Sequence, residues 1–227
     1  MIIFAHRGAS AYCLENSISS FKKAIELNIE YIELDVRVCK SGELIVIHDP
    51  TTKSVSNKVL KISKTNLKDL YKIRLKDNSK ILTLEKVLDL IEGRCKLNIE
   101  LKSENSAKPL VMLLSKYIKQ GKFDYSDFIV SSFLRKELLK FNKLFPKIKI
   151  GLLFEECPAN LIQFFGFKNI YSVHVNYKFI NRFWVVFYHI FGVKIFVFTV
   201  NNKSEILKLN KIKVDGVFSD YPDILIK

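Results

Sequence analysis

Short apolar runs alternate with amphipathic segments along most of the 227-residue chain. A run of a few apolar residues is typical of a buried strand, whereas apolar residues at every third or fourth position are typical of a helix. Eight runs fit the strand pattern. They are Ile2–Ala5, Tyr31–Val36, Leu97–Leu101, Phe128–Ser131, Ile148–Leu153, Ile170–His174, Ile195–Val200 and Gly216–Ser219.

Helical periodicity occurs between most neighbouring strand candidates. Thr83 is expected to cap the start of one helix, and Gly121 to end another, because threonine accepts free helix N–H groups and glycine adopts positive φ. The predicted helices are Leu14–Leu27, Leu84–Ile91, Pro109–Gln120, Leu134–Phe145, Asn160–Phe165, Ile180–Phe191 and Ser204–Leu209.

The alternation predicts a parallel sheet that is covered by helices. Eight such units in 227 residues favour an α/β fold of the (β/α)8 TIM barrel type over a doubly wound open sheet. Residues 44–80 break the alternation, since a short strand at Leu44–Ile47 is followed by a polar stretch. They therefore predict a small insertion between the second and third barrel strands, and residues 1–227 are predicted to form a single domain because no linker-like segment divides them.

The composition narrows the possible partners and locations. The net charge is +14, but the basic residues are mostly lysines scattered over predicted helices, and motifs of nucleic-acid-binding domains are absent. Nucleic acid is therefore not an expected partner. The four cysteines (Cys13, Cys39, Cys95 and Cys157) lack the paired spacing of a zinc site or a disulfide framework. Because the first residues do not resemble a signal peptide, a cytoplasmic location is predicted.

The most apolar stretch runs from Phe183 to Val200. It contains His189, Gly192 and Lys194, which favour a helix followed by a buried strand over a membrane span. Its aromatic residues, together with the basic balance of the chain, would also suit contact with anionic lipid. Packing of the helix on the barrel explains the same residues and is the interpretation that we favour here.

Polar residues gather where the first three predicted strands end. They are His6, Arg7, Glu33, Asp35, Glu100 and Lys102. Residues two apart on a strand point to the same side, so Glu33 and Asp35 are expected to share one side, as are Glu100 and Lys102. In a barrel, the carboxyl ends of the strands form the face that carries active sites.

Three carboxylates on adjacent strands predict a site of hard oxygen ligands that suits Mg²⁺, Ca²⁺ or Mn²⁺. The alternative is a structural ion network in which Arg7 and Lys102 neutralise the acids. A functional site is favoured because burying so many charges for structure alone is costly. His6, and His48 after the short strand, would then supply a general acid and base. His174 ends the sixth predicted strand, where it can line the pocket, and His189 is expected in packing or at the surface.

Several separated motifs resemble those of the glycerophosphodiester phosphodiesterase family in order and spacing. They are His6–Ser10, Leu14–Ser17, Ile32–Val36, Ile47–Asp49, Thr83–Leu88, Asn98–Lys102, Ser131–Phe133, Thr199–Asn201 and Gly216–Pro222. The resemblance covers nearly the whole chain. It implies a TIM barrel that hydrolyses small glycerophosphodiesters to an alcohol and glycerol 3-phosphate with the help of a metal ion.

The resemblance also implies the roles of individual residues. Glu33, Asp35 and Glu100 would bind one divalent cation, Mg²⁺ or Ca²⁺ with Mn²⁺ as a further candidate. His6 and His48 would act as general acid and base, with the assignment of the two roles left open.

The remaining roles implied by the resemblance concern the substrate. Arg7 and Lys102 would contact the phosphate, while Glu15 and Asn16 would shape the same pocket. Phe198 would form an aromatic wall where the family commonly has tryptophan. Two alternatives stay open: a sphingomyelinase D-like or lysophospholipase D enzyme, and a catalytically silent barrel that binds phosphodiesters.

Overall fold

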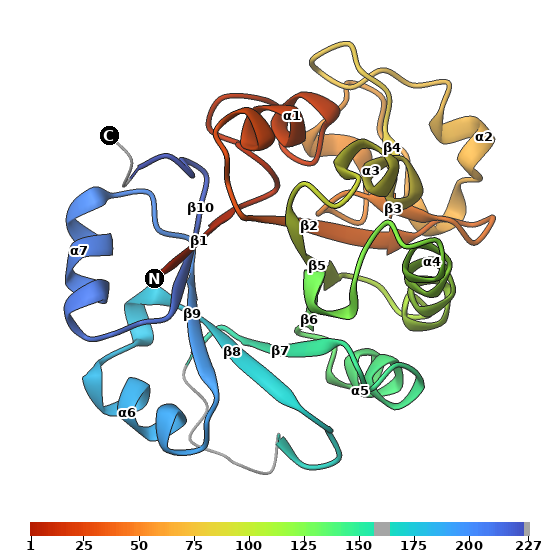
Figure 1. The fold of residues 1–227 in the computed structure, drawn as a ribbon. Coiled ribbons are helices and arrows are strands. Elements are labelled where there is room, and N and C mark those ends of the chain that lie inside the picture. Colours follow the sequence, from red (N-terminus) through yellow and green to blue (C-terminus); the bar gives the residue numbers. More distant parts are fainter. Residues whose placement is uncertain (157–163, 225–227) are drawn as a thin grey trace.

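The computed structural model describes residues 1–156 and 164–224. Within these residues, eight parallel strands form a closed barrel (Figure 1). They are β1 (Ile2–Ala5), β2 (Tyr31–Val38), β5 (Lys96–Leu101), β6 (Phe128–Ser132), β7 (Lys149–Phe154), β8 (Ile170–Asn176), β9 (Lys194–Phe198) and β10 (Gly216–Ser219). The barrel closes because β1 pairs with both β10 and β2. The predicted TIM barrel is thus confirmed, and the open sheet is excluded.

Helices surround the barrel on its outer side (Figure 1). They are α1 (Ile18–Glu26), α3 (Leu84–Ile91), α4 (Ala107–Lys119), α5 (Arg135–Leu144), α6 (Arg182–Ile190) and α7 (Lys203–Lys211). Their apolar stripes pack on the outward faces of the strands, as Phe21, Val87, Leu110 and Leu138 do, and all four are fully buried. The predicted caps are also present, since Thr83 Oγ1 accepts from Lys86 N and Gly121 has a positive φ.

A mostly aromatic layer of side chains fills the barrel interior beneath the carboxyl ends of the strands. Phe4, Tyr31, Ile129, Phe196 and Phe218 form one buried cluster, in which the rings of Phe4 and Phe218 stack at 4.5 Å. Side chains alternate along a strand, so the residues two positions further on also point inward, one layer closer to the carboxyl ends. The apolar layer therefore forms the floor beneath the site.

The insertion between β2 and β5 is confirmed. It holds β3 (Leu44–Val46), η1 (Thr52–Ser54), η2 (Ile62–Lys64), α2 (Leu67–Leu70) and β4 (Leu82–Thr83). Strand β3 pairs antiparallel with both β2 and β4. A separate apolar core that includes Ile45, Ile47, Ile62, Leu70 and Ile81 supports this segment, which holds the residues after β3 at the rim of the barrel.

Two helix predictions need comment. The helix predicted from Leu14 begins only at Ile18, because Asn16 has a φ of 52° and Ser17 is the N-cap, held by reciprocal bonds with Ser20. The preceding residues form a loop toward the site instead. The helix predicted at Asn160–Phe165 lies largely outside the described residues, as does Cys157.

The apolar stretch near the C-terminus forms α6 followed by β9, as predicted. In the part of the chain that the structure describes, none of the helices is both long and apolar enough to cross a bilayer. Cys13, Cys39 and Cys95 are free thiols.

Candidate active site

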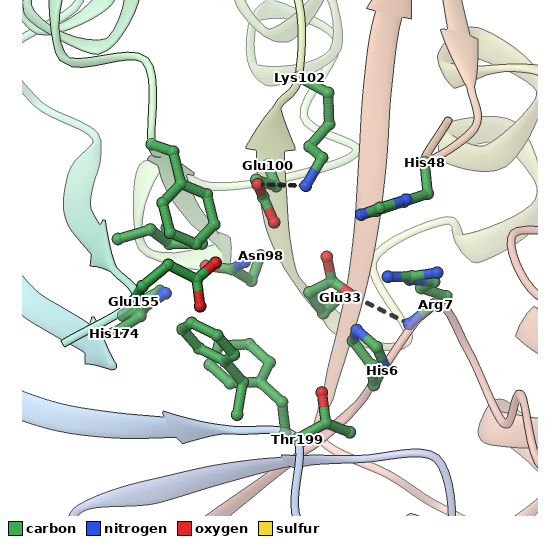
Figure 2. A pocket seen from close by; sticks show the side chains of 14 residues that line it. His6, Arg7, Glu33, His48, Asn98, Glu100, Lys102, Glu155, His174 and Thr199 are labelled. Atoms are coloured by element: carbon green, nitrogen blue, oxygen red, sulfur yellow. Dashed lines mark hydrogen bonds and ion pairs between the residues drawn. The ribbon is translucent and has the colours of Figure 1, made fainter. Parts of the chain in front are cut away.

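A pocket of about 170 Å³ opens at the carboxyl ends of the barrel strands. Figure 2 shows Glu33, Arg7, His6 and His48 on one side of it, with Glu155 and His174 on the other. The first side is built by the residues directly after β1, by β2 and by His48, two residues after the insertion's strand β3. Glu155, directly after β7, and His174 of β8 build the second. The predicted gathering of polar residues at this face is therefore present in the fold.

Three carboxylates form the base of the first side. Glu33, Asp35 and Glu100 are 3%, 1% and 8% exposed, and each offers an oxygen within 4.8 Å of the others. Burial and repulsion from Asp35 and Glu100 raise the pKa of Glu33 well above its usual range, although Arg7 opposes the shift. Burial, with repulsion from Asp35, raises the pKa of Glu100 to about 7. These oxygens fit a hard divalent cation, which would relieve both effects.

Two basic side chains contact the carboxylates. The Arg7 backbone N–H donates to Glu33 Oε2 at 2.8 Å, and its guanidinium lies 3.3 Å from Asp35 and 2.9 Å from Glu15. Lys102 Nζ lies 2.8 Å from Glu100 and 3.8 Å from Asp35 (Figure 2).

The cluster is not a balanced ion network. Among the described residues, Glu15, Asp35 and Glu100 form ion pairs with Arg7 or Lys102, whereas Glu33 accepts from the backbone N–H of Arg7. Arg37 also attracts Asp35 and Glu100, so with every group charged the four carboxylates exceed the three basic side chains by one negative charge in a largely buried place. A purely structural network would not leave such a deficit, because unpaired buried charge is costly. The imbalance favours the prediction of a cation site over the structural alternative.

Glu15 and Asn16 lie behind the pocket and do not line it. Asn16 Nδ2 donates to Asp35 Oδ2 at 3.0 Å, and Asn16 Oδ1 accepts from Asp35 N at 3.4 Å, so this amide orients Asp35. Glu15 accepts from the Arg7 guanidinium. Glu15 and Asn16 therefore lie close to the site, as predicted, but they contact Asp35 and Arg7 and do not line the pocket.

His6 is held by a carboxylate from the last strand end. Its Nδ1 lies 2.6 Å from Asp220 Oδ1, and Asp220 also accepts from Ser10 Oγ at 2.9 Å and Asn201 Nδ2 at 2.6 Å. Burial alone would raise the pKa of Asp220, but the bonds from His6, Asn201 and Ser10 outweigh it and lower this pKa to about 2. An ionised Asp220 favours a proton on Nδ1, which leaves Nε2 of His6 free to accept one.

His48 has a similar arrangement. Its Nδ1 lies 2.8 Å from Asp49 Oδ1, and its imidazole extends into the pocket (Figure 2). Burial lowers the pKa of His48, because the opposing effect of Asp35 is offset by Arg7 and Lys102. Its backbone oxygen accepts from Arg37 Nε at 2.7 Å, and Arg37 Nη1 donates to Lys102 O, also at 2.7 Å. Arg37 thus ties the insertion to β5.

The other side of the pocket is neutral or aromatic except for Glu155. Phe198 lines it as predicted, with its ring centroid 6.0 Å from that of Phe133. His174 also lines it, and burial lowers the pKa of His174 to about 3, so the imidazole is neutral at pH 7. Its Nε2 is 2.8 Å from Ser172 Oγ. Gly151 makes room for this ring, because a Cβ there would lie 2.5 Å from Nε2.

The sequence reasoning missed several residues of the site. Asp220 lies in the motif Gly216–Pro222, whose residues were assigned no role from the sequence. It follows the last strand as His6 follows the first, and the pairing of these two strands brings both positions together. Asn98 precedes Glu100 by two on β5 and lines the pocket, as the alternation rule would have shown. Glu155 and Arg37 gave no sequence signal.

Comparison with known proteins places this geometry in a family. Residues 6–224 match the glycerophosphoryl diester phosphodiesterase family. A glycerophosphodiester phosphodiesterase of Caldanaerobacter subterraneus subsp. tengcongensis is 35% identical over 237 residues, which cover 99% of this chain and 96% of the relative.

Solved structures agree with this match. A glycerophosphodiester phosphodiesterase from Thermotoga maritima has a TM-score of 0.81 at 30% identity, covering 100% of this chain and 97% of that one. An Oleispira antarctica phosphodiesterase, solved with the product sn-glycerol-3-phosphate, has a TM-score of 0.91 at 25% identity with the same coverage. The chain belongs to the glycerophosphodiester phosphodiesterase family and is an enzyme of that class.

Proposed function

We propose that this enzyme hydrolyses glycerophosphodiesters to glycerol 3-phosphate and an alcohol by metal-dependent catalysis with two histidines. The observation that carries the proposal is the meeting, at one pocket, of a cluster of three buried carboxylates, two of which line it, and two imidazoles that each have a carboxylate on Nδ1. The product bound to the Oleispira antarctica relative supports the choice of substrate class.

Glu33, Asp35 and Glu100 would hold the divalent cation, Mg²⁺, Ca²⁺ or Mn²⁺. A cation bound there supplies Lewis-acid stabilisation of the negative charge that develops on phosphoryl oxygens. Arg7 and Lys102 bind the phosphate from the same side and add positive charge near its oxygens. Asn16 keeps Asp35 in place through two hydrogen bonds, so the carboxylates are preorganised.

The two histidines move the protons. We assign His6 as the general base, because Asp220 stabilises the imidazolium that forms when Nε2 takes a proton from the attacking oxygen. We assign His48 as the general acid, which donates a proton to the leaving alkoxide in its protonated form. Because burial lowers the pKa of His48, this form is the minor one at pH 7, and the rate should fall as pH rises. Phe133 and Phe198 then flank the alcohol half of the substrate.

The test measures glycerol 3-phosphate release from glycerophosphocholine with each of the three metals and with EDTA. We expect release that depends on metal and is lost in His6→Ala and in Glu100→Gln. His189→Ala is the matched control, because His189 also pairs with an aspartate but lies outside the pocket. Release that survives EDTA, or survives His6→Ala, would contradict the mechanism.

The same assay separates the alternatives. A silent barrel gives no release with any of the metals. A lysophospholipase D or sphingomyelinase D-like enzyme cleaves lysophosphatidylcholine or sphingomyelin faster than glycerophosphocholine. The cytoplasmic location stays a prediction, with the free thiols of the described cysteines as its support.

A further inference from the structure

Helix α6 presents an apolar face to solvent. Phe179, just before the helix, is 45% exposed, and the helix and its C-cap add Phe183, Val186, Ile190 and Phe191, with exposures of 66%, 50%, 75% and 60%. We call these five residues the α6 apolar face. Packing on the barrel explains the opposite face of the helix, where Val185 and Tyr188 are buried, but it leaves these side chains in water.

The side chains lie together along the helix. Phe183, Val186 and Ile190 are spaced by three and four residues, which places them in one row on an α-helix. The rings of Phe183 and Phe187 stack at 6.3 Å, and those of Phe187 and Phe191 approach to 5.2 Å. Contiguous exposed apolar surface of this kind marks an interaction site more often than scattered single residues do.

The segment that carries this face has basic residues and no acidic ones. Residues 164–204 contain no Asp or Glu, but they contain the basic residues Lys168, Lys178, Arg182, Lys194 and Lys203. Lys178 and Arg182 are exposed at the N-terminal end of the apolar face. Asp215 approaches the helix through His189 Nε2, at 2.7 Å, but its carboxylate is already bonded to that ring and to Ile195 N.

We propose that the α6 apolar face docks on the surface of an anionic phospholipid bilayer. Aromatic and aliphatic side chains that insert at the headgroup level, beside basic residues that attract anionic lipid, are the two terms that hold an interfacial helix. A second copy of the chain is a poorer partner, because two molecules of net charge +14 would have to meet through regions that lack acidic side chains.

Docking in this way leaves the active site open. Helix α6 lies on the outside of the barrel, while the pocket lies at the carboxyl ends of the strands (Figure 1). Helix α6 begins shortly after β8, the strand that carries His174, so the N-terminal end of the apolar face is at the pocket end of the barrel. The proposal does not depend on the chemistry proposed above.

Trp184 makes the proposal directly measurable. It is the single tryptophan of the chain, it is half-buried, and its ring centroid lies 5.3 Å from that of Phe183 and 5.7 Å from that of Phe187. We would titrate the full chain with vesicles of phosphatidylglycerol or of phosphatidylcholine, following Trp184 emission and co-sedimentation. We expect a blue shift and sedimentation with phosphatidylglycerol vesicles, both weakened by salt.

Variants distinguish binding through the α6 apolar face from non-specific adsorption to vesicles. Phe183→Ser with Ile190→Ser should weaken binding to phosphatidylglycerol vesicles by about tenfold or more. The matched control is Met112→Ser with Leu144→Ser, which removes two exposed apolar side chains from α4 and α5, 66% and 51% exposed, and should leave binding unchanged. Thermal unfolding of each variant checks that it is folded.

A third variant tests the charge. Lys178→Glu with Arg182→Glu keeps the apolar face but should reduce binding to phosphatidylglycerol vesicles at low salt. Absence of binding by the wild-type chain at low salt would overturn the proposal, as would equal loss in the control variant. A concentration-dependent dimer in sedimentation that disappears in Phe183→Ser with Ile190→Ser would assign the face to a second copy instead.

Discussion

The two sides of the pocket differ in charge and in how their side chains are held. On the first side, Glu33 accepts from the Arg7 backbone N–H at 2.8 Å, and the Arg7 and His6 side chains each contact a carboxylate within 3 Å. On the second side, Phe133 and Phe198 meet ring to ring, and the neutral His174 lies against Phe196 and Phe218 at 5.3 and 5.1 Å. The comparison indicates a different role for each side. The hydrogen-bonded charged groups of the first side suit the reaction at the phosphate, whereas the aromatic rings of the second side suit contact with an alcohol whose identity can vary.

The strongest way to break this comparison is to remove one charge from the first side. Glu33→Gln keeps the shape but loses a ligand oxygen of the proposed cation site. We expect kcat/KM to fall by about 10³-fold or more, because metal stabilisation of phosphoryl charge supplies several kcal/mol. Initial rates with saturating Mg²⁺, Ca²⁺ or Mn²⁺ check this. A loss of less than tenfold would remove Glu33 from the ligand set.

Metal removal should also change the pH dependence of stability. Glu100 ionises near 4.5 in the unfolded chain and near 7 in the folded one, so the metal-free fold is penalised as pH rises between these values. Below about pH 4.5 this group costs nothing, and above pH 7 it costs on the order of 3 kcal/mol. Urea unfolding in EDTA across this range measures the slope, which should flatten in Glu100→Gln and when a divalent cation is restored.

A smaller effect is expected from Asp220→Asn, since Asp220 acts through His6. Loss of the carboxylate removes the preference for a proton on Nδ1, and we expect kcat to fall by about 10²-fold with little change in KM. The matched control is Asp215→Asn, which alters the aspartate partner of His189 outside the pocket. Stability should respond as well, because the depressed pKa of Asp220 means that its carboxylate stabilises the fold above about pH 4 and ceases to do so as pH falls toward 2.

The smallest expected effect comes from a substitution on the second side of the pocket. Glu155 is the acidic residue of this side, and it lines the pocket together with Phe133 and Phe198. A carboxylate beside aromatic rings favours a cationic head group. We therefore expect Glu155→Gln to lower kcat/KM several-fold for glycerophosphocholine but not for glycerophosphoglycerol. Equal losses for both substrates would place Glu155 on the glycerol half instead.

The strand pattern was enough to predict the barrel and the meeting of Glu33, Asp35 and Glu100, because alternation along adjacent parallel strands fixes which side chains share a face. The strand pattern did not predict the contacts of side chains that loops bring to the site. Asn16 adopts a positive φ that delays the start of the predicted helix to Ile18, and this turn brings its amide to Asp35. Arg37 reaches His48 and Lys102 through backbone oxygens, which leave no trace in the residue types.

Closure of the barrel determines when the active site can be complete. His6 stands at the start of the chain, but its carboxylate partner Asp220 is 214 residues away and arrives only when β10 pairs with β1. We therefore expect a shortened chain that lacks β10 to leave both the barrel and the His6–Asp220 pair incomplete, and to be inactive toward glycerophosphodiesters.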